Sequence, residues 1–145
     1  EGLYLATLER RYAELLELPL PLQIAGDAEA RVRGLMDAVW RFCRQHPDAV
    51  RLLLRHVVDH GALPDAINAS QSQRALERAL QLQDALGLPS MLRKRMALLT
   101  LNHLVARYAI SPDAALAPFC VDEEPEDAVA RHLGDVAVLL LLGPD

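Results

Sequence analysis

Apolar residues recur along this chain with the three- and four-residue spacing of α-helices, almost from end to end. Proline and glycine interrupt the pattern and divide it into segments of helical length. No segment alternates apolar and polar residues with the period of two that is typical of a β-strand. The predicted helices cover 1–18, 27–46, 47–60, 64–87, 90–110 and the segment from 125 to the closing Gly-Pro-Asp. We therefore expect an all-α antiparallel bundle of five to six main helices, in one domain over 1–145.

Residues at the segment ends fit helix termini. Asp27 has the short acceptor side chain of an N-cap, and Pro47 suits the first turn of the helix that it begins. Gly61 tolerates the left-handed backbone that commonly ends a helix. The stretch 111–119 predicts a short turn of helix followed by a loop.

The segment 90–110 is apolar nearly all round, which predicts burial on two faces. The last helix carries one apolar stripe beside a stripe of small residues that permits close helix approach. A two-fold interface of four helices, two from each chain, accounts for both patterns. The alternative is that both helices lie at the centre of one chain. The expected interface residues are Leu101, Leu104, Tyr108, Val129, Ala130, Leu133, Gly134, Ala137, Leu140 and Leu141.

Composition and charge limit the kinds of partner that the chain can bind. The chain is 52% hydrophobic and only 4% aromatic, so aliphatic side chains must build the core. Its net charge of −5 offers nucleic acid no general electrostatic footprint. Two isolated cysteines make neither a zinc ribbon nor a disulfide framework. The longest apolar run, 136–142, is too short to span a bilayer.

Residues 56–60, His-Val-Val-Asp-His, carry the most suggestive chemistry. Histidines four residues apart share one face of a helix, as they do in zinc peptidase helices. Catalytic zinc also needs a third protein ligand and a base, and nothing in the sequence fixes either one nearby. No nucleophile elbow or phosphate-binding loop is present. We expect no catalytic residue and no cofactor, with a metal-dependent hydrolase using His56 and His60 as an alternative.

Three stretches resemble a known family in order and character. They are EGLYLATLERRYAELLE at 1–17, DAEARVRGLMDAVWRFCRQHPDAVRLLLRHV at 27–57 and EDAVARHLGDVAVLLLLG at 126–143. Together with the apolar helix at 90–110, they resemble the C-terminal ligand-binding and dimerisation domain of TetR/AcrR-type transcriptional regulators. The resemblance covers essentially the whole chain, and its most specific part is the junction at 1–17.

The resemblance implies a cytoplasmic homodimer that binds operator DNA through a helix-turn-helix upstream of Glu1, which this chain does not contain. It makes 1–18 the helix that connects the two domains. A small apolar or amphipathic effector would favour one arrangement of the 47–60 helix and so change the separation of the two DNA-reading domains. The alternative is an all-α homodimeric binding module with no role in transcription.

Pocket candidates combine this resemblance with the residue pattern. Asn102 and His103 are polar residues on a mostly apolar helix, where they make either an internal contact or a ligand contact. Met36, Trp40 and Cys43 cluster on one side of their helix, as core residues or as pocket lining. The full set of candidates is Tyr12, Met36, Trp40, Cys43, Val57, His60, Gln71, Met96, Leu99, Asn102 and His103.

Overall fold

The computed structural model describes residues 2–17, 26–61 and 95–143, together with Glu77, Gln81 and Asp84. Across these residues the chain is all-helical and contains no strand, which confirms the predicted all-α class. The predicted helix over 64–87 lies outside the described residues, apart from the three single positions, and so does the segment 90–94. The elements are α1 (Gly2–Leu16), α2 (Ala28–Gln45), α3 (Pro47–His60), α5 (Arg95–Ala109), α6 (Asp113–Leu116), the 3₁₀ turn η2 (Ala117–Phe119) and α7 (Pro125–Leu142).

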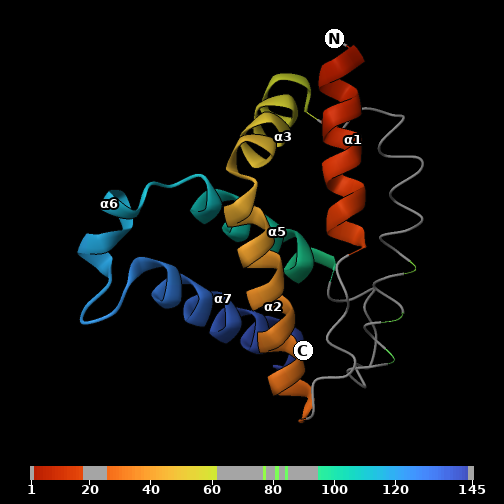
Figure 1. Cartoon of the computed structure of the whole chain (residues 1–145). Coiled ribbons are helices and arrows are strands. Elements are labelled where there is room, and N and C mark those ends of the chain that lie inside the picture. The colour runs from red at the N-terminus through yellow and green to blue at the C-terminus, as the bar shows by residue number, and fades with distance from the viewer. Residues whose placement is uncertain are drawn as a thin grey trace.

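The helix α2 is the centre of the described fold. It packs across α7 and α5, which also pack on each other. At its C-terminal end α2 leads into α3, which lies beside α1 (Figure 1). The α6 and η2 segment links α5 to α7 and projects from the opposite side of the molecule (Figure 1). No helix among the described residues is both long and apolar enough to cross a membrane.

Local capping explains where the helices begin and end. The Asp27 carboxylate accepts a hydrogen bond from the Ala30 N–H at 2.9 Å, which confirms the predicted N-cap of α2. Gly61 has φ 76°, and its N–H donates to the Val57 carbonyl at 2.8 Å, which ends α3 as predicted. Pro47 occupies the first turn of α3, where a backbone N–H has no helical partner to lose.

The core lies between α2, α5 and α7. Val32, Trp40 and Leu133 are its fully buried large side chains. The Trp40 indole Nε1 donates to the Glu126 carbonyl at 3.2 Å, which satisfies its polar group and ties α2 to the start of α7. On α7 the inward stripe repeats every four residues: Val129, Leu133, Ala137 and Leu141.

The structure corrects the interface expected for α7 and α5. Of the ten residues expected there, six are buried inside the single chain, because α2 covers that face of α7 and α5. These are Leu101, Val129, Leu133, Gly134, Ala137 and Leu141. The stripe of small residues receives a side chain of α2 instead of a partner helix, since a Cβ on Gly134 would lie 3.3 Å from Nη1 of Arg33. The other four, Leu104, Tyr108, Ala130 and Leu140, are half-buried.

Candidate ligand-binding site

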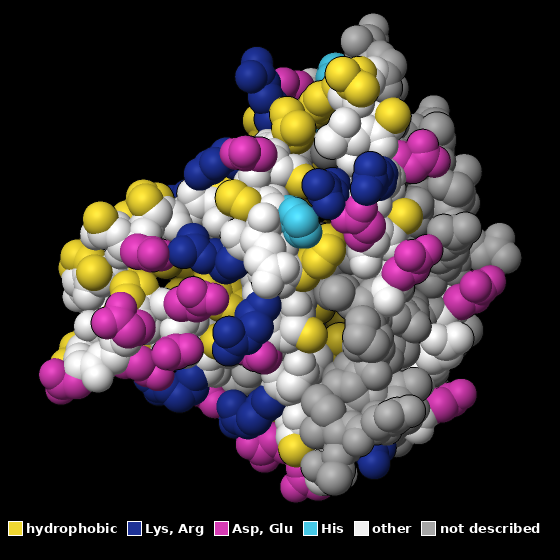
Figure 2. Space-filling view, in the orientation of Figure 1, with side chains coloured by type: hydrophobic (Ala, Val, Ile, Leu, Met, Phe, Trp, Pro, Cys, Tyr) yellow, Lys and Arg dark blue, Asp and Glu magenta, His cyan; other side chains and the backbone are white. Residues whose placement is uncertain are grey.

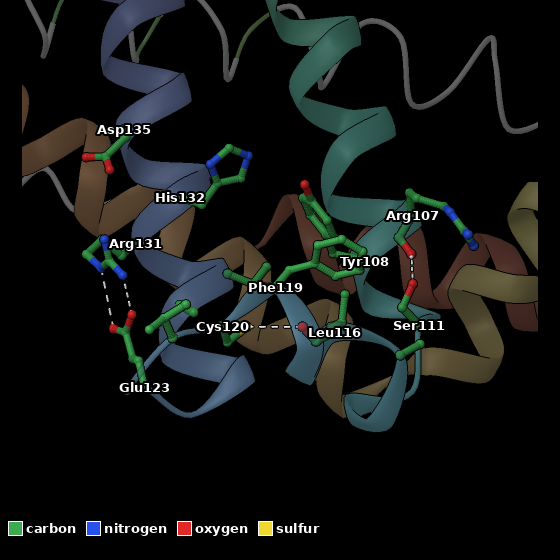
Figure 3. A pocket seen from close by; sticks show the side chains of 14 residues that line it. Arg107, Tyr108, Ser111, Leu116, Phe119, Cys120, Glu123, Arg131, His132 and Asp135 are labelled. Carbon is green, nitrogen blue, oxygen red and sulfur yellow. Dashed lines mark hydrogen bonds and ion pairs between the residues drawn. The ribbon is translucent and has the colours of Figure 1, made fainter.

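A cavity of about 640 Å³ opens between the end of α5, the α6–η2 segment and the first half of α7 (Figure 3). This volume falls within the range of sites that hold small organic ligands. In the space-filling view hydrophobic side chains gather over the α6 side and line a hollow bordered by charged groups (Figure 2). The lining residues are Arg107, Tyr108, Ser111, Ala115, Leu116, Phe119, Cys120, Val121, Glu123, Ala128, Val129, Arg131, His132 and Asp135.

The segment after α5 folds into one wall of this cavity through local hydrogen bonds. The Ser111 hydroxyl donates to the Arg107 carbonyl at 2.9 Å, which satisfies one of the carbonyls in the last turn of α5. The Cys120 thiol donates to the Leu116 carbonyl at 3.4 Å and holds η2 against α6. Asp122, at φ 60°, takes the left-handed backbone that turns the chain into α7.

A second set of contacts fastens this wall to the core. Arg44 of α2 donates from Nη2 to the Asp113 carboxylate at 2.6 Å and from Nη1 to the Ser111 carbonyl at 3.3 Å. The guanidinium also lies over the Trp40 ring, 5.6 Å from its centroid. The cavity wall is therefore attached to the central helix α2 as well as to its neighbours in sequence.

The cavity walls are mostly apolar, and two polar side chains of the lining contact each other. Tyr108 of α5 and His132 of α7 meet edge to face, with ring centroids 5.9 Å apart and planes at 82° (Figure 3). Neither the Tyr108 hydroxyl nor the His132 imidazole has a hydrogen-bond partner within the described part of the chain. Phe119 and Val121 are 84% and 81% exposed at the edge of the cavity, where an apolar ligand gains from covering them.

Three of the four charged groups of the lining are in ion pairs, one of them with a residue outside the lining. Arg131 forms an ion pair with Glu123, and hydrogen bonding from Arg131 lowers the pKa of the Glu123 carboxyl. The Asp135 carboxylate accepts from Nη1 of Arg33 on α2 at 2.6 Å. The Arg107 guanidinium points away from α7 (Figure 3). The site therefore favours a largely apolar, uncharged ligand with one or two hydrogen-bonding groups.

The pocket candidates from the sequence lie elsewhere. Met36, Trp40 and Cys43 are buried in the core, where burial raises the pKa of the Cys43 thiol to about 11. Val57 is half-buried, whereas five candidates are exposed on α3 and α5: His60, Met96, Leu99, Asn102 and His103. The side chain of Tyr12 and the whole of Gln71 lie outside the described residues.

Two of the candidates, Cys43 and Asn102, do line a smaller void of about 50 Å³ where α1, α2, α3 and α5 meet. Its other lining residues are Arg11, Phe42, His46, Ala49, Val50, Leu53, Val105 and Ala106. This void is too small for the effector that the sequence led us to expect.

Sequence reasoning missed the large cavity because it took 111–119 for an ordinary connection. The signal that was present is the apolar content of this connection, whose Leu116 and Phe119 need cover that a surface loop does not provide. Tyr108 and Val129, which were both expected at a dimer interface, also line the cavity.

Within the described residues, no group of three or more histidine, cysteine, aspartate or glutamate side chains is arranged to hold a metal ion. Comparison with protein-family models, with curated proteins and with solved structures found no match.

Proposed function

We propose that this chain is the effector-binding and dimerising domain of a TetR-type transcriptional regulator, and that a small apolar or amphipathic effector binds in the 640 Å³ cavity. The helix order and the family resemblance of 1–17, 27–57 and 126–143 support the family assignment. The observation that carries the binding function is the cavity itself, with mostly apolar walls and two polar groups, Tyr108 and His132, that make no hydrogen bond within the described residues.

The helix α5 connects this cavity to the part of the chain that would face DNA. It lines the cavity with Tyr108 and packs on α3, which in turn packs on α1. The Tyr4 hydroxyl of α1 donates to the Leu52 carbonyl of α3 at 3.0 Å. An effector that prefers one position of α5 therefore biases α3 and α1, and it shifts operator affinity only by its difference in affinity for the two states.

The proposed dimer uses the outward faces of α5 and α7, since α2 occupies their inward faces. Met96 and Leu139 are 71% and 70% exposed, and Leu99 is 44% exposed. Large apolar side chains at these positions contribute to stability only when a partner covers them. Leu104 and Leu140, two of the interface residues expected from the sequence, are half-buried, and we place them in the same proposed interface.

Protection of Cys120 from alkylation tests whether a ligand binds in the cavity. Cys120 lines it, whereas Cys43 is buried in the core and serves as an internal control. A screen of uncharged apolar compounds by thermal shift should find binders that slow alkylation of Cys120. A binder at one hundred times its dissociation constant stabilises the protein by about 2.7 kcal/mol.

A matched pair of variants on α6 assigns the binding to this cavity. Ala115 and Ala114 are both exposed, but only Ala115 lines the cavity. Ala115→Trp should fill the space and abolish both the thermal shift and the protection, and Ala114→Trp should retain both. Equal binding by the two variants would place the ligand elsewhere.

The coding sequence upstream of Glu1 tests the regulatory part. A helix-turn-helix there supports a TetR-type regulator, and the effector should then change operator affinity in a gel-shift titration. A start codon directly before Glu1 contradicts the regulator and leaves a homodimeric small-molecule-binding module, which the cavity supports equally well.

A further inference from the structure

The last turns of α3 bring two imidazoles together. The rings of His56 and His60 have centroids 4.4 Å apart, with their planes tilted by 45°. His60 is exposed and His56 is half-buried, so the pair is open to solvent. We propose that His56 and His60 chelate one divalent late transition-metal ion, with water completing its coordination. This site is separate from the effector cavity and does not depend on the proposed function.

The ring separation matches a chelate. A metal–nitrogen bond of about 2.1 Å places the ion roughly 3.2 Å from the centroid of each imidazole that binds it. Two such rings then have centroids roughly 4.5 Å apart at a right angle between the bonds, and roughly 5.2 Å apart at the tetrahedral angle. The observed 4.4 Å is close to the right-angle value, so the two rings lie at about the separation that a shared ion requires.

The surroundings leave the imidazoles free and favour a cation. Within the described chain neither ring has a hydrogen bond or an ion pair. Asp59, the neighbouring acid, pairs with Arg55 at 3.5 Å. His60 is the last residue of α3, where the carbonyl ends of the helix dipole attract positive charge.

Donor chemistry selects the class of ion. Imidazole nitrogen suits copper, zinc and nickel, whereas magnesium and calcium prefer oxygen ligands. Affinity at such a site rises toward Cu²⁺ in the divalent series. Catalytic zinc needs three protein ligands, and the described residues supply only these two here. We therefore assign this site a binding role.

Metal binding at this position should also stabilise the contact between α1 and α3. The Tyr4 ring of α1 lies 6.0 Å from the His56 ring, and its hydroxyl donates to the Leu52 carbonyl one turn earlier on α3. An ion that links His56 to His60 fixes this last stretch of α3 in its helical form. Only the folded helix presents both rings together, so the ion stabilises the folded state.

Titration with CuCl₂, ZnCl₂ and NiCl₂, using tag-free protein freed of metal by a chelating resin, tests the site. Calorimetry should show saturable binding of one ion per chain, with copper bound most tightly. His56→Gln and His60→Gln should each weaken copper binding on the order of a hundredfold, because a chelate loses its second donor. The electron paramagnetic resonance spectrum of bound Cu²⁺ should show two nitrogen ligands in the wild type and one in each variant.

His103→Gln is the matched control, since His103 is an exposed histidine on α5. This variant should bind copper as the wild type does. Absence of saturable copper binding would overturn the proposal, and so would wild-type affinity in His60→Gln or an equal loss in His103→Gln. A ratio of one ion per two chains would also overturn it, because the ion would then bridge chains. His60 is exposed, so its replacement leaves the fold intact.

Discussion

Alanine substitution at two leucines of α7 tests which face of this helix is inside. Leu133 is fully buried in the core cluster, and Leu139, six residues later, is 70% exposed. Truncating a buried leucine removes its transfer free energy and leaves a cavity, at a cost of about 2 to 5 kcal/mol. Leu133→Ala should therefore lower the free energy of unfolding by that amount, and Leu139→Ala by less than about 0.5 kcal/mol.

Urea unfolding followed by far-UV circular dichroism measures both values. For a domain of this size each kcal/mol lowers Tm by roughly 2 to 4 °C, so Leu133→Ala should melt about 4 to 20 °C below the wild type. Each variant is measured at two protein concentrations, because dimerisation makes apparent stability depend on concentration. At the lower concentration the two substitutions report on the folding of single chains.

Equal losses of unfolding free energy in Leu139→Ala and Leu133→Ala at the lower concentration would contradict the assigned burial of these two leucines. A loss in Leu139→Ala that appears only at the higher concentration supports the proposed dimer. Sedimentation velocity then separates the two roles: Leu139→Lys should shift the protein toward monomer. Val58→Lys, at an 80% exposed position of α3, is the matched control and should not change the sedimentation coefficient.

Three further predictions concern the thiols, an ion pair and the α1–α3 contact. Iodoacetamide should modify Cys120 in the folded protein and should modify Cys43 only after unfolding, because burial keeps the Cys43 thiol protonated with a pKa of about 11. Peptide mass spectrometry measures the alkylation of both cysteines, and equal rates would contradict the assigned burial. Arg131 lowers the pKa of the Glu123 carboxyl from 4.5, so this ion pair stabilises the folded protein above that pH, and its contribution is lost as the pH falls through the lowered pKa. The urea midpoint should therefore fall less between about pH 7 and about pH 3 in Glu123→Gln than in the wild type. Tyr4→Phe removes the hydrogen bond to α3 and should lower the free energy of unfolding by about 0.5 to 1.5 kcal/mol. Limited proteolysis should then cut more readily within α1, and an unchanged digestion pattern would contradict the coupling of α1 to α3.

Helix ends were predictable because single residues determine them. A short acidic side chain at 27 satisfies a free N–H, and a glycine at 61 adopts a backbone that other residues resist. The buried stripe of α7 was predictable only in part: Val129 and Leu133 belong to the expected apolar stripe, whereas Ala137 was assigned to the stripe of small residues beside it. Spacing identifies an apolar stripe without identifying what covers it, and the covering element here is α2 of the same chain.

The orientation of α5 was predicted the wrong way round, for a physical reason. A helix that is apolar on all sides gives its hydrophobic pattern little power to select a face. The sequence interpretation placed Met96 and His103 toward a ligand and Leu101 toward a partner, whereas the structure exposes the first two and buries Leu101. The polar residues were the better guide, because burying Asn102 and His103 without partners costs more than exposing a methionine.

This orientation links the two proposed activities of α5. Tyr108 lines the effector cavity, and the outward face of the same helix carries Met96 and Leu99, which the proposed dimer covers. If effector binding moves α5, it alters the surface that meets the partner chain. Coupling free energy is reciprocal, so dimerisation must then change effector affinity by the same factor by which the effector changes dimer affinity. Effector affinity measured at protein concentrations below and above the monomer–dimer transition tests this coupling. An effector affinity that does not change with protein concentration would mean that effector binding and dimerisation are not coupled.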